Sequence, residues 1–258
     1  MQLIRDVARK ILSFVAALCG QILVSKRHFV DEGSDAIFKS LPLSGEHCYI
    51  EDAHRYTAQS VMAYFHQAVL QDTFWFGVKT VKNPCDFWIY QQLIYNIRPD
   101  VILEIGVYHG GSTLALAHLM DLMGHGRVIG IDIDMSRVHA AVVSHQRITL
   151  VEGDACQVEP TISKMIDKSE TVLIIEDSLH TFENTYNILH TYFSYVSTGS
   201  YFIIEDSVSG HGLEGGHKAG PYEAIQKFIQ EVDIFKIDRE QERYFFTFNP
   251  KGFLKRIR

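Results

Sequence analysis

One short acidic phrase occurs twice in this chain, each time at the end of an apolar run. Residues 173–178 read LIIEDS and residues 202–207 read FIIEDS. Isoleucine-rich runs of this length are typical of buried strands in a parallel sheet, and the chemistry of such sheets lies at the carboxyl ends of the strands. Because clustered carboxylates repel one another unless a cation or a proton lies between them, the two phrases predict a divalent metal site. The alternative is that these acids cap helices or end strands in solvent.

A glycine-containing turn forms a second candidate site. Residues 101–112 read VILEIGVYHGGS, in which Gly106 and Gly110 allow the backbone to turn sharply beside a ligand and Ser112 can cap the following helix. The glycine spacing is not the G-x-G-x-x-G pattern of dinucleotide sites. Glu104 precedes the first glycine, where a carboxylate repels a pyrophosphate but attracts a cationic ligand. S-adenosylmethionine, which carries an ammonium and a sulfonium, has the required charge.

Two further acids follow the next two predicted strands. Asp132 stands where acids of such folds hold ribose hydroxyls, and Asp154 stands where a carboxylate can accept an adenine amino hydrogen. With Glu104 they form an ordered set on successive strands, and His109 lies beside them in the glycine turn. The set predicts a methyl-donor site. The alternatives are a nucleotide-dependent dehydrogenase or loops whose acids only cap helices.

The elements that must position these residues alternate between strands and helices. Predicted strands cover residues 101–103, 127–131, 148–151, 173–175 and 200–204, and predicted helices cover residues 85–97, 113–123, 135–144, 161–168, 183–195 and 222–232. Such alternation is typical of an α/β protein with a doubly wound, mainly parallel, Rossmann-like sheet. Residues 234–237 and 244–248 are predicted to add an antiparallel strand pair at the end of the chain.

The first part of the chain does not show this alternation of strands and helices. Residues 1–70 are predicted to be a helical appendage to a domain formed by residues 71–258. A stripe of apolar residues predicts an amphipathic helix near the start: Ile4, Val7, Ile11, Val15, Leu18 and Ile22. A packing or oligomer helix, and hence a homo-oligomer, is the favoured interpretation. Association with a membrane surface and a secretion signal are the alternatives.

Composition limits the class of protein. The 258 residues carry a net charge of -7, which argues against a sequence-independent grip on nucleic acid. The apolar stretch near the start is too short for an integral membrane span. Four widely spaced cysteines without a CxxC pair indicate reduced thiols and a cytoplasmic protein.

Several short stretches resemble one known family. Residues 74–77 (FWFG), 82–86 (KNPCD), 104–112 (EIGVYHGGS) and 248–256 (FNPKGFLKR) are similar to the cephalosporin hydroxylase and rhamnosyl O-methyltransferase family, and the similarity extends over residues 74–258. The resemblance implies a class I S-adenosylmethionine-dependent fold and a divalent metal. The hydroxylase activity in the family's name is not expected of this chain. Non-haem iron oxygenases use two histidines and a carboxylate, generally starting from H-x-D or H-x-E, and no histidine of this chain has that neighbour.

Similarity to the catechol-type O-methyltransferases implies roles for individual residues. Asp177, Glu205 and Asp206 are implied as metal ligands, and ligation by oxygen alone suits Mg²⁺. His180 occupies the position at which those enzymes have a lysine base, which implies a general base. The alternative for His180 is packing or an ordinary hydrogen bond. Glu176 is expected either to face a helix or to replace one ligand.

The sequence therefore predicts an S-adenosylmethionine- and Mg²⁺-dependent O-methyltransferase. Its small-molecule acceptor is expected to be a hydroxyl of a sugar or glycoside, or of a secondary metabolite. The alternatives are a nucleotide-dependent sugar oxidoreductase and a non-catalytic partner subunit that binds S-adenosylmethionine. The glycine-rich residues 210–220 are a candidate lid, with His211 and His217 open to a contact with substrate or metal.

Overall fold

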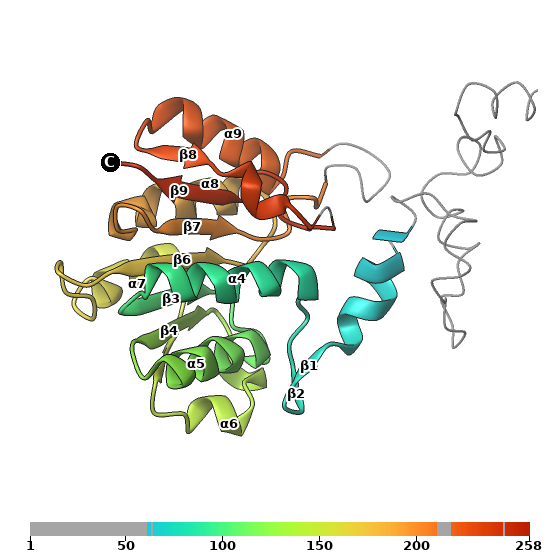
Figure 1. Cartoon of the computed structure of the whole chain (residues 1–258), viewed down its shortest axis with the longest axis vertical. Coiled ribbons are helices and arrows are strands. Elements are labelled where there is room, and N and C mark those ends of the chain that lie inside the picture. Colours follow the sequence, from blue (N-terminus) through green and yellow to red (C-terminus); the bar gives the residue numbers. More distant parts are fainter. Residues whose placement is uncertain (1–60, 63, 211–217, 245) are drawn as a thin grey trace, which may run out of the picture. The chain divides into compact units, whose positions relative to one another are not determined.

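The computed structural model describes residues 61–62, 64–210, 218–244 and 246–258 (Figure 1). These residues belong to the second of two units into which the chain divides, His54–Arg258. The predicted amphipathic helix near the start, the rest of residues 1–60 and the segment with His211 and His217 lie outside the described residues. The boundary expected at residue 70 therefore stays a prediction.

Seven strands of the described residues form one sheet, in the order β5-β4-β3-β6-β7-β9-β8. The strands are β3 (Val101–Ile105), β4 (Arg127–Asp132), β5 (Ile148–Glu152), β6 (Val172–Glu176), β7 (Tyr201–Ile204), β8 (Phe235–Ile237) and β9 (Phe253–Arg256). Strands β3 to β7 pair in parallel, whereas β9 pairs antiparallel with both β7 and β8. The predicted doubly wound, mainly parallel sheet with an antiparallel C-terminal pair is confirmed.

The chain leaves β3 in one direction along the sheet and returns beside it at β6. Strands β4 and β5 extend the sheet on one side of β3, and β6 and β7 extend it on the other. Ligands of open α/β sheets bind at such a reversal, outside the carboxyl ends of the strands. Glu104 near the end of β3, Asp132 at the end of β4 and the acids that follow β5, β6 and β7 lie along this edge. The topology thus gathers residues that are far apart in the sequence.

Helices cover both faces of the sheet (Figure 1). They are α4 (Pro84–Ile97), α5 (Gly111–Met123), α6 (Ala140–Val143), α7 (Ala155–Ile162), α8 (Phe182–Tyr192) and α9 (Pro221–Glu231), with single turns at Phe65–Val69 (a π-helix), Leu70–Asp72, Met135–Arg137, Phe193–Tyr195 and Arg239–Glu242. Alternate strand residues face opposite sides. Leu103 and Ile105 pack with α7, α8 and α9, whereas Ile102 packs with α4 and α5. A small hairpin, β1 (Phe74–Trp75) and β2 (Val78–Lys79), precedes α4.

Local signals explain where the helices begin. Asn83 caps α4 by accepting a hydrogen bond from the Cys85 amide (3.1 Å), and Pro84 is the first helical residue. Asp154 caps α7 by accepting from the amides of Cys156 (2.9 Å) and Gln157 (3.2 Å). This cap makes α7 begin at Ala155 rather than near residue 161, where a helix was predicted, and Pro160 lies inside it.

Two further predictions of local structure are wrong. The predicted helix at 135–144 is divided, because the side chains of Asp134 and His139 each cap a separate short turn. The partner of strand β8 is Phe253–Arg256 and not residues 244–248. Phe248 instead packs in the interior, where its amide donates to Asp86 (2.9 Å), so this segment is held against α4.

No helix among the described residues is long and apolar enough to cross a membrane.

Candidate active site

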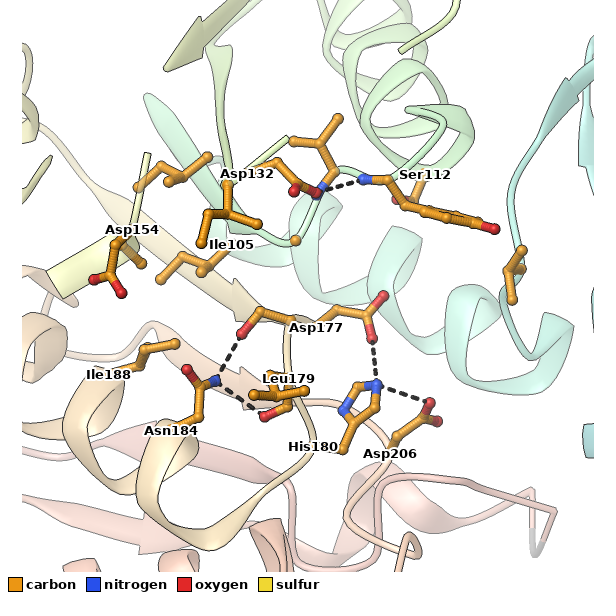
Figure 2. A pocket seen from close by; sticks show the side chains of 18 of the residues that line it. Ile105, Ser112, Asp132, Asp154, Asp177, Leu179, His180, Asn184, Ile188 and Asp206 are labelled. Atoms are coloured by element: carbon orange, nitrogen blue, oxygen red, sulfur yellow. Dashed lines mark hydrogen bonds and ion pairs between the residues drawn. The ribbon is translucent and has the colours of Figure 1, made fainter. Parts of the chain in front are cut away.

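A pocket of about 570 Å³ opens at the carboxyl ends of the central strands (Figure 2). This volume is within the range of small-molecule sites. Its walls come from the β3–α5 turn, the ends of β4, β5 and β6, the start of α8 and the segment after β2. The lining residues include Thr80, Val81, Gly106, Tyr108, Ser112, Asp132, Ile133, Asp154, Asp177, Leu179, His180, Asn184 and Asp206.

The turn after β3 approaches the turn after β6 closely. Gly106 has a φ of +99°, and a Cβ on it would lie 1.9 Å from the carbonyl oxygen of Asp177. Only glycine fits both the conformation and the space. The amides of Val107 (2.8 Å) and Tyr108 (2.7 Å) donate to the Asp132 carboxylate, which ties this turn to the end of β4.

The predicted cofactor residues fall into two groups. Gly106, Ser112, Asp132 and Asp154 line the pocket, whereas Glu104, His109 and Gly110 do not.

Each of the three residues outside the pocket lining has other partners. Glu104 is fully buried and accepts hydrogen bonds from the hydroxyls of Ser112 and Thr113. Burial raises the pKa of its carboxyl group. The Nδ1 of His109 lies 3.2 Å from the carbonyl oxygen of Arg137, and Gly110 is the N-cap residue that precedes α5. Glu104 therefore contacts the wall of the pocket through the Ser112 hydroxyl.

An acidic cluster with one histidine faces the pocket. Asp177, His180 and Asp206 bring one ligand atom each within 4.8 Å of one another, and Figure 2 shows their side chains converging. The Nε2 of His180 is 3.8 Å from Asp177 Oδ1 and 3.5 Å from Asp206 Oδ2. Its Nδ1 is buried without a hydrogen-bond partner among the described residues. Burial lowers the pKa of His180, but the charges of Asp206, Asp177 and Glu176 outweigh it, and the pKa is raised.

Glu205, the third predicted metal ligand, lies behind this wall. It is buried, does not line the pocket, and its Oε1 accepts a hydrogen bond from the Lys82 ammonium at 2.6 Å. Lys82 also donates to Asp177 Oδ2. Burial and the charge of Asp177 raise the pKa of Glu205 despite the opposing effect of Lys82. The structure thus brings His180, rather than Glu205, beside Asp177 and Asp206 at the pocket surface.

Lys82 carries no predicted role, although it stands in the KNPCD stretch on which the family resemblance partly rests. One feature of the sequence could have indicated a role for Lys82. It directly precedes the Asn-Pro start of a helix, which fixes the backbone that carries its side chain.

Glu176, the other acid of the first phrase, faces a helix. This was one of the two alternatives expected for it, the other being that it replaces a metal ligand. Glu176 is fully buried, and its carboxylate accepts from the Ser178 hydroxyl (2.6 Å) and the Thr185 hydroxyl on α8 (3.5 Å). Asn184 donates to the Ser178 hydroxyl (2.9 Å) and lines the pocket.

Asp206 is held from behind by the C-terminal segment. It adopts a left-handed conformation (φ 48°) that is uncommon outside glycine, and its amide donates to the Asn249 side chain at 2.9 Å. The Asn249 amide donates in turn to the Tyr90 hydroxyl at 2.7 Å. Asn249 and Tyr90 are both buried, so this chain of contacts fixes the direction of Asp206.

The sheet order, the helices on both faces and the acid-lined pocket at the strand reversal define the class I fold of S-adenosylmethionine-dependent methyltransferases. Solved structures of CmcI share it. The Mg–SAM structure of CmcI aligns with a TM-score of 0.58 at 24% identity, and the apo structure with a TM-score of 0.57 at 25% identity. Each alignment covers 83% of this chain and 87% of the other.

The model of the Rhamnosyl O-methyltransferase/CmcI family matches residues 67–257, and the chain belongs to this family. The rhamnosyl O-methyltransferase of Mycobacterium tuberculosis H37Rv is 28% identical over 202 residues, which are 75% of this chain and 82% of the relative. That of Mycobacterium leprae is 29% identical over 75% of this chain and 87% of the relative. The chain is therefore an S-adenosylmethionine-dependent O-methyltransferase.

Proposed function

We propose that this enzyme methylates a hydroxyl of a sugar or glycoside in a reaction that depends on Mg²⁺. The observation that carries the proposal is the convergence of Asp177, His180 and Asp206 on the pocket that Asp132 and Asp154 also line. Carboxylates and a histidine at one end, and two further acids at the other, suit an acceptor hydroxyl and a cationic donor bound side by side.

The residues present fit a divalent cation. Asp177 and Asp206 offer hard oxygen ligands at the pocket surface, as Mg²⁺ prefers, and Glu205 is the predicted third ligand. When bound there, Mg²⁺ would lower the pKa of the acceptor hydroxyl and hold it for transfer. The Mg–SAM structure of CmcI is compatible with this proposal.

His180 then acts as the general base. Its Nε2 faces the two carboxylates at the pocket surface, so a hydroxyl bound beside them lies within its reach. His180 takes the hydroxyl proton while the acceptor oxygen bonds to the methyl carbon and the sulfur–methyl bond breaks. Asp132 and Asp154 hold the ribose and adenine of the donor, and Gly106 and Ser112 shape the wall beside it.

The names of the relatives support a sugar as the acceptor. The mycobacterial proteins are rhamnosyl O-methyltransferases, and the resemblance to them covers three quarters of this chain. A secondary metabolite is the second candidate for the acceptor.

The test is methyl transfer to a panel of glycosides and secondary metabolites, read as a mass gain of one methyl group. We expect turnover of at least one glycoside with Mg²⁺, loss of turnover in EDTA and recovery with added Mg²⁺. Asp206→Asn should lower turnover by at least about 100-fold, because a metal ligand is lost. Asp233→Asn changes the charge equally at a surface position that is 84% exposed, and serves as the control. Full activity in EDTA together with an unimpaired Asp206→Asn enzyme would remove the metal from the reaction.

The rival functions predict other results. A nucleotide-dependent sugar oxidoreductase would bind NAD and not S-adenosylmethionine, and a partner subunit would bind the donor without turnover. The homo-oligomer also stays a prediction, which light scattering of the full chain tests.

A further inference from the structure

Lys82 is the only lysine or arginine among the described residues that is buried, with 6% of its side chain exposed. Its ammonium bridges two of the three predicted metal ligands, Asp177 through Oδ2 and Glu205 through Oε1. Neither Lys82 nor Glu205 lines the pocket, whereas Asp177 does. A cation supplied by the chain itself thus stands directly behind the acidic cluster.

The two oxygens of Asp177 have different partners. Oδ2 accepts from Lys82, and Oδ1 lies 3.8 Å from the Nε2 of His180 on the pocket side. Lys82 therefore fixes the rotation of this carboxylate and directs its other oxygen toward the pocket.

The backbone that delivers Lys82 is anchored on both sides. The Lys82 amide donates to the Thr73 hydroxyl at 3.2 Å, next to the β1–β2 hairpin. The following residue, Asn83, caps α4 and donates to Asp86 at 2.9 Å. The ammonium consequently lies between the carboxylates because the fold positions it there, and not because a surface lysine happens to reach them.

Charge makes this ammonium necessary. Asp177, Glu205 and Glu104 all act on Lys82 electrostatically, and Glu104 and Glu205 are buried. Buried carboxylates without a cation repel one another, and removal of one partner of a buried ion pair leaves an uncompensated charge. A divalent cation bound to the same carboxylates would meet a positive charge already in place.

We propose that Lys82 is an internal competitor of the divalent cation: its ammonium holds Asp177 and Glu205 together, and the cation takes both carboxylates as ligands only by displacing it. The inference rests on the proposed metal dependence and assigns Lys82 a positioning role within it. The competition lowers the affinity of the site for the divalent cation below that of three clustered acids without a lysine. The bound cation can therefore exchange with cations in solution.

The first test compares Lys82→Met with the wild-type protein by calorimetric titration with MgCl₂. Lys236→Met is the matched control, because Lys236 is exposed and its loss changes the net charge equally. We expect Lys82→Met to bind Mg²⁺ at least about tenfold more tightly, since both a competitor and a like charge are removed. Lys236→Met should bind like the wild type.

Thermal unfolding supplies a second measurement. In EDTA the Tm of Lys82→Met should fall by about 10 °C, because the buried carboxylates lose the one lysine or arginine that is buried among the described residues. Mg²⁺ should restore most of this loss. The wild-type protein should gain much less from Mg²⁺. An equal fall with and without Mg²⁺ would assign Lys82 a structural role alone and overturn the inference.

The wild-type chain gives a third measurement that does not depend on whether Lys82→Met folds. With ¹⁵N-labelled lysine, the ammonium of Lys82 should give a protected NMR signal in EDTA, identified by its absence from Lys82→Arg. Saturation with Mg²⁺ should shift or remove this signal, and an unchanged signal would overturn the inference.

The outcomes separate the two proposals. If the wild type binds Mg²⁺ and Lys82→Met binds it no more tightly, the inference fails while the metal dependence stands. If neither protein binds Mg²⁺, the proposed metal dependence fails first and the inference fails with it.

Discussion

His180, the proposed general base, lies beside two carboxylates at the pocket surface, Asp177 and Asp206. Although burial lowers its pKa, Asp206, Asp177 and Glu176 raise it above the ordinary value of 6.5. Only neutral imidazole accepts a proton, so kcat/KM should fall as the pH drops through this raised pKa. A divalent cation at the carboxylates offsets their charge, and the fall should therefore move to lower pH as Mg²⁺ is increased.

Substitution of His180 should damage chemistry rather than donor binding. We expect His180→Gln to lower the single-turnover rate by about 10²–10⁴ and to remove the acidic fall of kcat/KM. The affinity for S-adenosylmethionine should barely change, because Asp132 and Asp154, the proposed donor-binding acids, are untouched. His190→Gln, on the α8–α9 surface beside Glu231, is the control. A rate within a few fold of the wild type would mean that another group takes the proton.

At the level of single residues, the place of the acids at the strand ends could be predicted because carboxylates after apolar runs are visible as a pattern. The sequence did not predict their directions. Asp177 and Asp206 face the pocket, but Glu205 turns inward to Lys82 and Glu176 turns toward α8. These directions depend on partners far away in the sequence, such as Asn249 beside Asp206, and no local spacing encodes them.

Among the elements, the contact between the turns after β3 and β6 leads to a stability prediction. Gly106→Ala would place a methyl group 1.9 Å from the Asp177 carbonyl oxygen, so these turns would have to separate. We expect a loss of about 3 kcal/mol or more in the free energy of unfolding. Gly124→Ala is the matched control: Gly124 also has a positive φ (62°), but nothing lies within 4 Å of its Cβ position. It should cost only about 1 kcal/mol, from backbone strain.

Urea unfolding of both variants measures this difference. Similar losses for the two would mean that strain, and not the close approach of the turns, makes glycine necessary at position 106. Donor affinity should fall with Gly106→Ala alone, because Gly106 lines the pocket and Gly124 does not.

The predicted elements were most accurate where periodicity and caps agree. The strands from β3 to β7 follow from their apolar runs, and α4 follows from its Asn-Pro start. The predicted bounds of an element were wrong where a polar residue could either contact a ligand or cap a helix. Asp154 was assigned to the cofactor and capping was kept as the alternative, but the cap was not used to place the start of α7, so the predicted helix began several residues too late. Aromatic residues 244–248 suited a strand, but their tertiary contact with Asp86 decided otherwise.

For the whole molecule, the division of the chain into two units shows where the described residues of the candidate site lie. Every strand and every pocket residue of the described part belongs to His54–Arg258, and the family match begins at residue 67. The topology of the sheet alone brings the acids of five strands to one edge. The described part of the candidate site therefore lies within this unit.

A shortened chain of residues 54–258 tests this view. Because such a unit has its own core, it should unfold cooperatively, and its Kd for S-adenosylmethionine should stay within about threefold of that of the full chain. Calorimetric titration with the donor, alongside circular dichroism of both chains, measures the two properties. Methyl transfer to the acceptor is compared in the same preparations, since the role predicted for the amphipathic helix near the start, packing or oligomerisation, bears on assembly and not on donor binding. A folded shortened chain that no longer binds the donor would show that residues 1–53 contribute to the site.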